Sequence, residues 1–387
     1  GRERSGFEID DINSSLYVNR GVIRFEEFRA ATATSSIYLP LMIIKGENWE
    51  QYKNYIDEVD MIGYVAESTI STDDLGYFAP GLKDWNTTVS DIQATFEGVV
   101  KNFKGDLIGA TIGKESFVRG TYHIIGLPDW RTSNYVIGIE ELRATSEDIT
   151  TLADNILREP LPAKVMDIFD RAEWVKLRAT YGGRFSSFRV VGNVDTGAGN
   201  VSGDVKIRQI NGGRYDVGGI VSTNSLDLGN LLGVQKLHRL NSDIALAATM
   251  GSSASGGIIG NVDVKVNGLG FGDYVYSAIS GTGRVEGNTY LAEVNSDDPN
   301  LEFGMFASVD MARELPAYAI SMDLRRADLQ ALGFNRRDSV SVLSASIGAE
   351  IAGREIEDMD GSISIANGQY SYPGGDVSLD RLRIDFE

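Results

Sequence analysis

Apolar and polar residues alternate along much of this sequence, and the alternation limits the possible folds more than any other feature. In the stretch 201–208, Val201, Val205 and Ile207 share one parity, while Lys206 and Arg208 have the other. The same pattern recurs in the stretches 244–250, 262–266, 301–309, 318–324 and 382–386. Successive side chains of a β-strand point to opposite faces, so this period predicts antiparallel sheets with one apolar and one solvated face.

Turn residues and a few short helical patterns divide the strands. Clusters of Gly, Asn, Asp and Pro predict turns at 195–200, 211–213, 267–268, 295–300 and 373–375. Capping residues followed by apolar ones predict four short helices, at Thr72–Phe78, Ser146–Leu152, Ser225–Leu232 and Ala327–Gly333. A further helix or linker is expected between Pro160 and Trp174, and a change of parity after Val342 indicates a bulge. Similar strands follow three of the helices, which indicates a loose internal repeat.

The number of strands narrows the architecture. The spacing of the turns implies on the order of 25 strands, and strongly twisted open sheets rarely exceed about 10 strands without curling or splitting. Stacked sandwiches, a β-solenoid and a curled sheet remain as alternatives. Separate modules and repeats of fixed length are both missing. We therefore expect an all-β chain with a few short helices, folded as a long curled antiparallel sheet with a U-shaped groove. Residues 1–387 would form one continuous segment, with a soft subdivision near 158–174.

Composition excludes several classes of function. The 36 basic and 55 acidic residues give a net charge of −19, which argues against a nucleic-acid partner. There are no cysteines, so disulfides and thiolate chemistry are excluded. The two histidines, His123 and His238, are far apart in sequence and have no evident catalytic partner. No run of about 20 apolar residues is present.

The candidate polar sites are better explained as turn or packing residues than as functional sites. The acidic turns Ser296–Asn300 and Glu357–Gly361 lack the spacing of an EF-hand, so solvated turns are expected rather than calcium sites. The four tryptophans (Trp49, Trp85, Trp130 and Trp174) are more typical of packing than of sugar platforms. The segment Gly251–Gly257 matches neither a P-loop nor a nucleophile elbow. We predict no catalytic residue, no cofactor and no metal, and hence no enzyme.

The sequence resembles the Bacteroidetes branch of the TamB/AsmA-like translocation and assembly module family. The closest run lies between Val175 and Ile207, with TYGGRFSSF at 180–188, GNVDTG at 192–197 and GNV at 199–201. Ser68–Pro80 and Ser225–Gly229 are similar in style, and the likeness extends from about Asp10 to the end. These motifs are structural and degenerate rather than catalytic.

The resemblance implies an envelope protein of Gram-negative bacteria. Members are anchored in the inner membrane by one N-terminal helix, cross the periplasm with a β-taco body, and work with an outer-membrane barrel partner of the TamA type through a C-terminal domain. Their assigned roles are phospholipid transport and assembly of outer-membrane proteins. This chain would be an internal periplasmic piece, without the anchor and the C-terminal region.

The alternation and the resemblance lead to one functional hypothesis. An apolar groove with a solvated exterior suits phospholipid acyl chains, because each buried CH₂ contributes about 0.8 kcal/mol. An ordinary closed core is the alternative reading of the same residues. The competing functions are a cell-surface carbohydrate-binding or polysaccharide-degrading β-protein and a passive, adhesin-like fragment. The residues expected to line the groove are Val201, Val205, Ile207, Ile244, Leu246, Val262, Val264, Val266, Leu301, Phe303, Met305, Ile320, Met322, Ile384 and Phe386.

Overall fold

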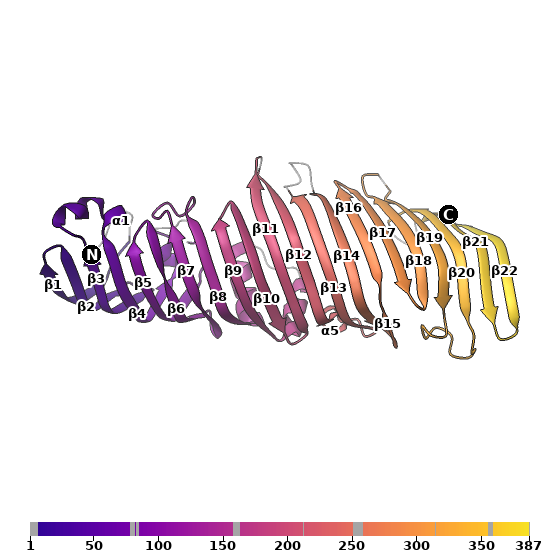
Figure 1. Ribbon diagram of the computed structural model, residues 1–387, viewed down its shortest axis with the longest axis horizontal. Coiled ribbons are helices and arrows are strands. Elements are labelled where there is room, and N and C mark those ends of the chain that lie inside the picture. The colour runs from indigo at the N-terminus through magenta and orange to yellow at the C-terminus, as the bar shows by residue number, and fades with distance from the viewer. Residues whose placement is uncertain are drawn as a thin grey trace. The chain divides into compact units, whose positions relative to one another are not determined.

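The computed structural model divides the chain into two compact units. Unit 1 is Gly1–Gly197 and unit 2 is Ala198–Glu387. The structure describes residues 7–77, 82, 85–157, 163–211, 213–250, 258–313, 315–354 and 359–386. Both units consist mainly of β-strands (Figure 1). The boundary after Gly197 lies beyond the segment 158–174, near which the sequence suggested a soft subdivision; residues 158–162 lie outside the described part.

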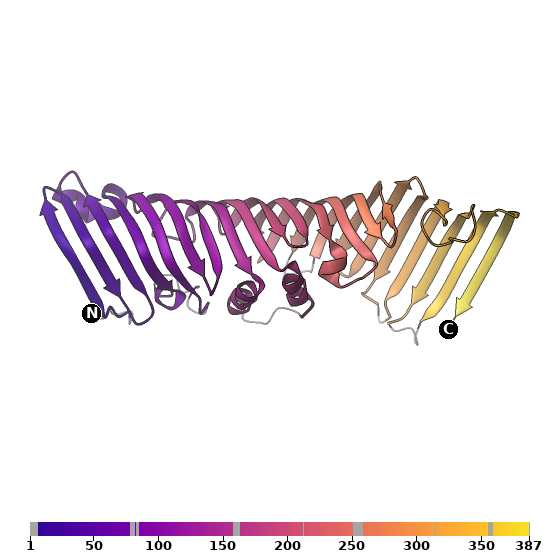
Figure 2. The same cartoon turned by 90° about the horizontal axis from the view of Figure 1, so that it is seen from below.

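Unit 1 contains ten strands and most of the helices in the described part of the chain. The strands are β1 (Asp11–Asn19), β2 (Val22–Ala31), β3 (Ser36–Lys45), β4 (Asp60–Ser71), β5 (Thr88–Val99), β6 (Asn102–Ile112), β7 (Ser116–Ile125), β8 (Asn134–Thr145), β9 (Trp174–Arg184) and β10 (Ser187–Thr196). The helices are the 3-10 helix η1 (Trp49–Asn54) and α1 (Tyr55–Glu58), α2 (Thr72–Leu75), α3 (Ser146–Leu157) and α4 (Ala163–Ala172). Figure 2 shows α3 and α4 as a helical pair that projects from the strands.

Unit 2 contains the remaining strands and one short helix, α5 (Leu228–Leu232). The strands are β11 (Gly199–Ile210), β12 (Arg214–Asp227), β13 (Leu237–Met250), β14 (Ile258–Phe271), β15 (Tyr274–Tyr276), β16 (Ile279–Glu286), β17 (Thr289–Asp298), β18 (Leu301–Asp310), β19 (Ala317–Asp328), β20 (Val342–Ala352), β21 (Asp360–Tyr372) and β22 (Gly375–Phe386).

Within each unit the strands form an antiparallel meander. Consecutive strands pair in order, from β1 with β2 to β9 with β10 in unit 1. In unit 2 the order is the same, except that β14 pairs with both the short β15 and β16. The expected fold class is confirmed: the described chain is all-β with a few short helices, and its antiparallel sheet is not closed.

In each unit, bulges gather near the strand ends on one side of the sheet, which we call the bulged edge. In unit 1 the non-glycine residues Glu27, Glu67 and Asp91 have positive φ, close to the edge where α2 and α3 connect the strands. In unit 2, Ser225 and Asn367 have positive φ near the edge where α5 lies. Register shifts between neighbouring strands also lie near these strand ends, including the one at Ser344–Ser346. A bulge bends its strand and increases the local twist, so these bulged edges are where each sheet curves.

The core is small for a chain of this length. The solvent-accessible surface is 23362 Å², whereas two separate compact domains of half this mass would expose about 18000 Å² in total. Half of the buried apolar residues in the described part are alanines. One cluster of buried residues in unit 2 joins Tyr276, Leu324, Ala327 and Leu332 near its bulged edge. Compact packing is therefore local, and the wider sheet surface stays accessible to solvent.

The helix predictions had mixed outcomes. Helices begin at Thr72 and Ser146 as expected, and α4 occupies the segment after Pro160. The third helix is shorter than predicted, because Ser225 is a bulge of β12 and the helix begins only at Leu228. The prediction at Ala327–Gly333 is wrong: Ala327 and Asp328 are the last residues of β19, and a hydrogen-bonded turn follows. That turn places Leu332 against Tyr276 and Leu324, and this packing outweighs the local helical preference.

Candidate functional site

Unit 2 carries a continuous apolar face formed by side chains paired across its strands. Directly paired residues of an antiparallel ladder point to the same face, so the register defines rows. One row consists of Gly203, Val221, Ile244, Val264, Gly281, Val294, Met305, Met322, Ile347, Ile365 and Leu382. The next consists of Val205, Gly219, Leu246, Val262, Gly283, Ala292, Ala307, Ile320, Ala349, Ile363 and Ile384. We call these rows one and two.

Two further rows border the first pair. Row three begins at Ile207 and ends at Phe386. Row four, on the side of the bulged edge, contains Val201, Val266 and Phe303. Leu301 lies two residues from Phe303 along β18, with the same parity. All the residues expected to line a groove thus lie on one face, the apolar face of unit 2.

The side chains of this face are not sealed in a core. No residue of rows one to three is fully buried, and Ile320 in the middle of row two is 41% exposed. Burial increases only toward the bulged edge, where Leu301, Phe303 and Met322 pack against the cluster around Tyr276. These three residues therefore contribute to the small core as well as to the face.

The opposite face of unit 2 is mainly polar. Arg208 and Asp216 form an ion pair at 2.7 Å, and Arg325 and Glu302 form another at 2.6 Å. Three apolar residues on this face, Ile220, Ile259 and Phe306, are each about half exposed. The two faces of unit 2 thus differ in chemistry as the alternation predicted.

Unit 1 has an apolar face of its own, which the sequence reasoning missed. One row begins with Phe25, Met42, Gly63 and Phe96 in β2 to β5. It continues with Gly105, Tyr122, Ile137, Tyr181 and Val190 in β6 to β10. The available signal was one aromatic residue on this row in each of three strands: Phe96 in β5, Tyr122 in β7 and Tyr181 in β9. Glycines stand where apolar residues would have completed the pattern in β4 and β6.

Aromatic side chains fill the space above those glycines. The Phe96 ring lies where a Cβ at Gly63 would be, and a Cβ at Gly105 would collide with the Thr95 carbonyl oxygen. The Tyr122 side chain extends over Gly105, and its hydroxyl donates a hydrogen bond of 2.8 Å to the Thr95 carbonyl oxygen. Burial, with the nearby Asp106 carboxylate, raises the pKa of Tyr122 to about 12. Tyr122 therefore remains protonated and acts as a cross-strand donor.

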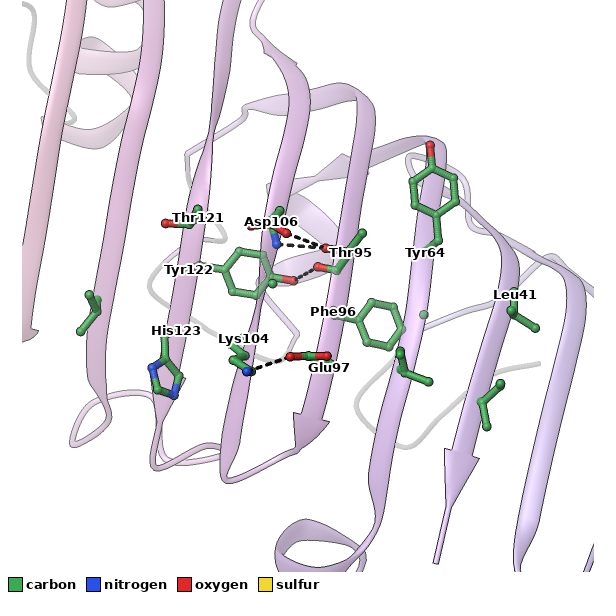
Figure 3. Close-up of a pocket in the computed structure, with 15 residues that line it drawn as sticks. Leu41, Tyr64, Thr95, Phe96, Glu97, Lys104, Asp106, Thr121, Tyr122 and His123 are labelled. Carbon is green, nitrogen blue, oxygen red and sulfur yellow. Dashed lines mark hydrogen bonds and ion pairs between the residues drawn. The ribbon is translucent and has the colours of Figure 1, made fainter.

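A hollow of about 680 Å³ opens on unit 1 (Figure 3). Most of its side chains belong by register to the face opposite Phe96, including Ile62, Glu97, Lys104 and His123. Glu97 and Lys104 form an ion pair at 2.8 Å across its floor. This face of unit 1 thus mixes charged and apolar residues, unlike the polar face of unit 2.

Three aspartates fasten loops at the bulged edges. Asp148 accepts hydrogen bonds from the backbone N–H groups of Lys114, Glu115 and Ser116, at 2.8, 3.0 and 2.8 Å, and from the Ser116 hydroxyl. Burial alone would raise its pKa, but these donors outweigh burial and lower the pKa to about 2. Asp74 accepts from three hydroxyl groups in a similar way. These carboxylates are occupied as structural acceptors.

The third aspartate corrects the expectation of a solvated turn at Ser296–Asn300. Asp298 is only 2% exposed and accepts from the Tyr274 hydroxyl at 2.6 Å and from the Ser277 backbone at 2.8 Å. Its pKa is lowered, because hydrogen bonds from Tyr274, Asn300 and Ser277 outweigh the effect of burial. No group of three metal-ligating side chains occurs among the described residues. In the second acidic turn, Glu357 and Asp358 lie outside the described residues, as does Gly251–Gly257.

The remaining candidate residues do not converge. The four tryptophans lie in η1, before β5, in the β7–β8 connection and at the start of β9. His123 contacts the Asn102 side chain at 2.6 Å in unit 1, and His238 lies on β13 in unit 2.

Comparison with family models, with curated proteins and with solved structures finds no match to this chain. Among the described residues, no helix has the length and apolar character needed to cross a membrane.

Proposed function

We propose that this chain shelters lipid acyl chains on the apolar face of unit 2, as a periplasmic segment of an envelope-spanning bridge protein. The observation that carries the proposal is the partial exposure of every residue in rows one to three. Exposed apolar surface of this extent is costly in water, and contiguous patches usually mark an interaction site. An acyl chain has the matching chemistry, because it needs apolar contact along its length and no polar partner.

The composition of the face supports an acyl chain over a sugar. Rows one and two contain only aliphatic residues, methionines and glycines, and no aromatic, hydroxyl or charged side chain. Sugars are held by hydrogen-bonding groups and aromatic platforms, which these rows lack. Burial of each CH₂ contributes about 0.8 kcal/mol, so the free energy of binding increases with the length of acyl chain that the face covers.

The wider role follows from the resemblance to the TamB/AsmA-like family. We infer that the full-length protein has an inner-membrane anchor and a C-terminal region for a barrel partner of the TamA type. Its function would be phospholipid transport and support of outer-membrane protein assembly. The solvated second face of unit 2, with its ion pairs, supports a location in an aqueous compartment.

The test is lipid recovery from matched variants, measured by native mass spectrometry of the purified chain. Val262→Asp combined with Met322→Asp places two charges on the apolar face. Asn261→Asp combined with Ser321→Asp places the same charges on the next residues, which are exposed on the other face. We expect phospholipid on the wild type and on the second variant, and none on the first.

Circular dichroism distinguishes a binding defect from unfolding. Charges on an open face remain hydrated, so the apolar-face variant should keep its β signal. A wild type free of lipid, or equal recovery from both variants, would contradict the proposal. Unfolding of the apolar-face variant alone would show that the rows form a sealed core instead.

A further inference from the structure

Three turns at the bulged edge of unit 2 come together and expose apolar side chains. The first follows α5 and spans 232–236, the second is the β14–β15 turn 271–275, and the third is 334–337 between β19 and β20. The backbone N–H of Gly272 donates to the carbonyl of Lys236 at 2.7 Å, which joins the first turn to the second. Arg336 forms an ion pair with Asp273, which joins the second to the third. Figure 1 shows α5 and β15 at the same, lower edge of this unit.

The apolar residues of these turns are more exposed than those of the apolar face. Phe334 is 68% exposed, Val275 is 64% exposed and Leu232 is 51% exposed. Leu231, Tyr276 and Leu332, each one or two residues away in sequence, are buried. The turns are therefore anchored by one set of apolar side chains while they present another set to solvent.

The charges that remain available at these turns are basic. Lys236 and Arg337 in these turns, and Arg239 near the start of β13, are exposed and make no ion pair within the described part of the chain. Within the three turns, Lys236, Arg336 and Arg337 stand against one carboxylate, Asp273, so the net charge of the turns is positive. This local character contrasts with the net charge of −19 of the whole chain.

We propose that these three turns form a docking surface for an anionic lipid bilayer. Exposed apolar tips insert into the boundary between headgroups and acyl chains, and flanking basic side chains bind anionic headgroups. The turns project from an edge and form no groove, which suits a broad lipid surface. Because the rest of the protein repels an anionic membrane, contact through this edge would also fix the orientation of unit 2.

The test is co-sedimentation of the full chain with vesicles of phosphatidylcholine alone or mixed in equal parts with phosphatidylglycerol. We expect binding only to the mixed vesicles, with weaker binding at about 0.5 M salt, where screening is stronger. Each basic side chain near an anionic surface contributes a factor of about five. Lys236→Gln combined with Arg337→Gln should therefore weaken binding about 25-fold. Phe334→Ser should weaken it about tenfold, because a partly buried phenylalanine contributes that much.

Matched variants on the polar face of unit 2 serve as controls. Lys206→Gln combined with Lys265→Gln removes the same charge, and Phe306→Ser removes an exposed phenylalanine. Both should bind mixed vesicles like the wild type. Absence of binding, equal binding to neutral vesicles, or equal losses in the control variants would overturn the proposal. Val262→Asp with Met322→Asp should still bind vesicles, so the result is independent of lipid recovery on the apolar face.

Discussion

The two units build the same antiparallel meander but occupy their apolar faces differently. In unit 1, aromatic rings cover the face: Phe96 stacks on Phe103 at 5.6 Å between centroids, and Tyr181 stacks on Phe188 at 5.0 Å. In unit 2, the two central rows contain no aromatic residue. Unit 1 thus fills much of its own face, whereas unit 2 leaves an aliphatic surface that a ligand can cover. Strand alternation alone does not distinguish these outcomes.

The largest expected effect concerns the glycines beneath the rings. Gly105→Ala places a methyl against the Thr95 carbonyl oxygen, so the backbone must shift. We expect the free energy of unfolding of unit 1 to fall by about 3 kcal/mol, as for overpacked sites. All four tryptophans belong to unit 1, so their fluorescence during urea denaturation follows that unit alone.

Gly281→Ala in unit 2 is the matched substitution. Its Cβ would lie 3.5 Å from the nearest atom, which is ordinary contact. We expect little change, measured by circular dichroism, which reports both units. Equal destabilisation by the two substitutions would contradict the claim that the apolar face of unit 1 is more tightly filled than that of unit 2.

The next effect concerns the aspartate that fastens unit 1. Asp148→Asn removes a buried charged acceptor from four donors and should lower the free energy of unfolding by about 2 kcal/mol. Because the folded pKa is depressed to about 2 from 3.8, the wild type should have this stabilisation above pH 4 and lose it as the pH falls toward 2. Tryptophan fluorescence in urea at several pH values measures both effects.

The adjacent residue provides the control. Glu147 pairs with Lys114 but is largely exposed, so Glu147→Gln should leave the stability nearly unchanged. If Asp148→Asn kept the acid dependence of the wild type, another carboxylate would fasten this edge.

A smaller effect is expected from the cross-strand tyrosine. Tyr122→Phe keeps the ring over Gly105 but leaves the Thr95 carbonyl oxygen without this donor. We expect a loss of about 1 to 2 kcal/mol in urea denaturation. Tyr55→Phe, at an exposed position of the same unit, should be neutral. A neutral Tyr122→Phe would show that ring packing alone covers this glycine.

The smallest effect should come from the hollow on unit 1. Glu97→Gln breaks the ion pair with Lys104, and both side chains are about half exposed. Such surface pairs contribute little, so the urea midpoint should stay within experimental error. A clear shift would mean that the charged and apolar residues of this hollow are more strongly coupled than the polar face of unit 2.

The sequence was sufficient to assign the faces of unit 2 because parity is a local property of a strand. Val205 and Met322 lie far apart in sequence, yet each could be assigned to a face from its neighbours alone. The bulge predicted after Val342 was wrongly placed, because the extra residue lies in the partner strand β21, where Asn367 has a positive φ. Register and pairing then brought the predicted residues into common rows.

Long-range packing was not readable in the same way. The alternation in unit 1 is interrupted at Gly63 and Gly105, and only the fold reveals that Phe96 and Tyr122 cover these positions. Asp298 resembled a solvated turn residue because its main donor, Tyr274, is 24 residues away. The segment after Asp328 looked helical from its local sequence, but the packing of Leu332 on β15 determines its turn conformation. Each of these features depends on residues brought together only by folding.

The central claim is that acyl chains contact the aliphatic rows of unit 2, and photo-crosslinking tests it most directly. A phospholipid with a diazirine near the end of one acyl chain would be bound to the full chain, irradiated and mapped by peptide mass spectrometry. The account predicts adducts on row residues such as Leu246, Val262 and Met305. Adducts confined to exposed residues of the other face, such as Asn261 and Lys265, or spread evenly over both faces, would contradict it.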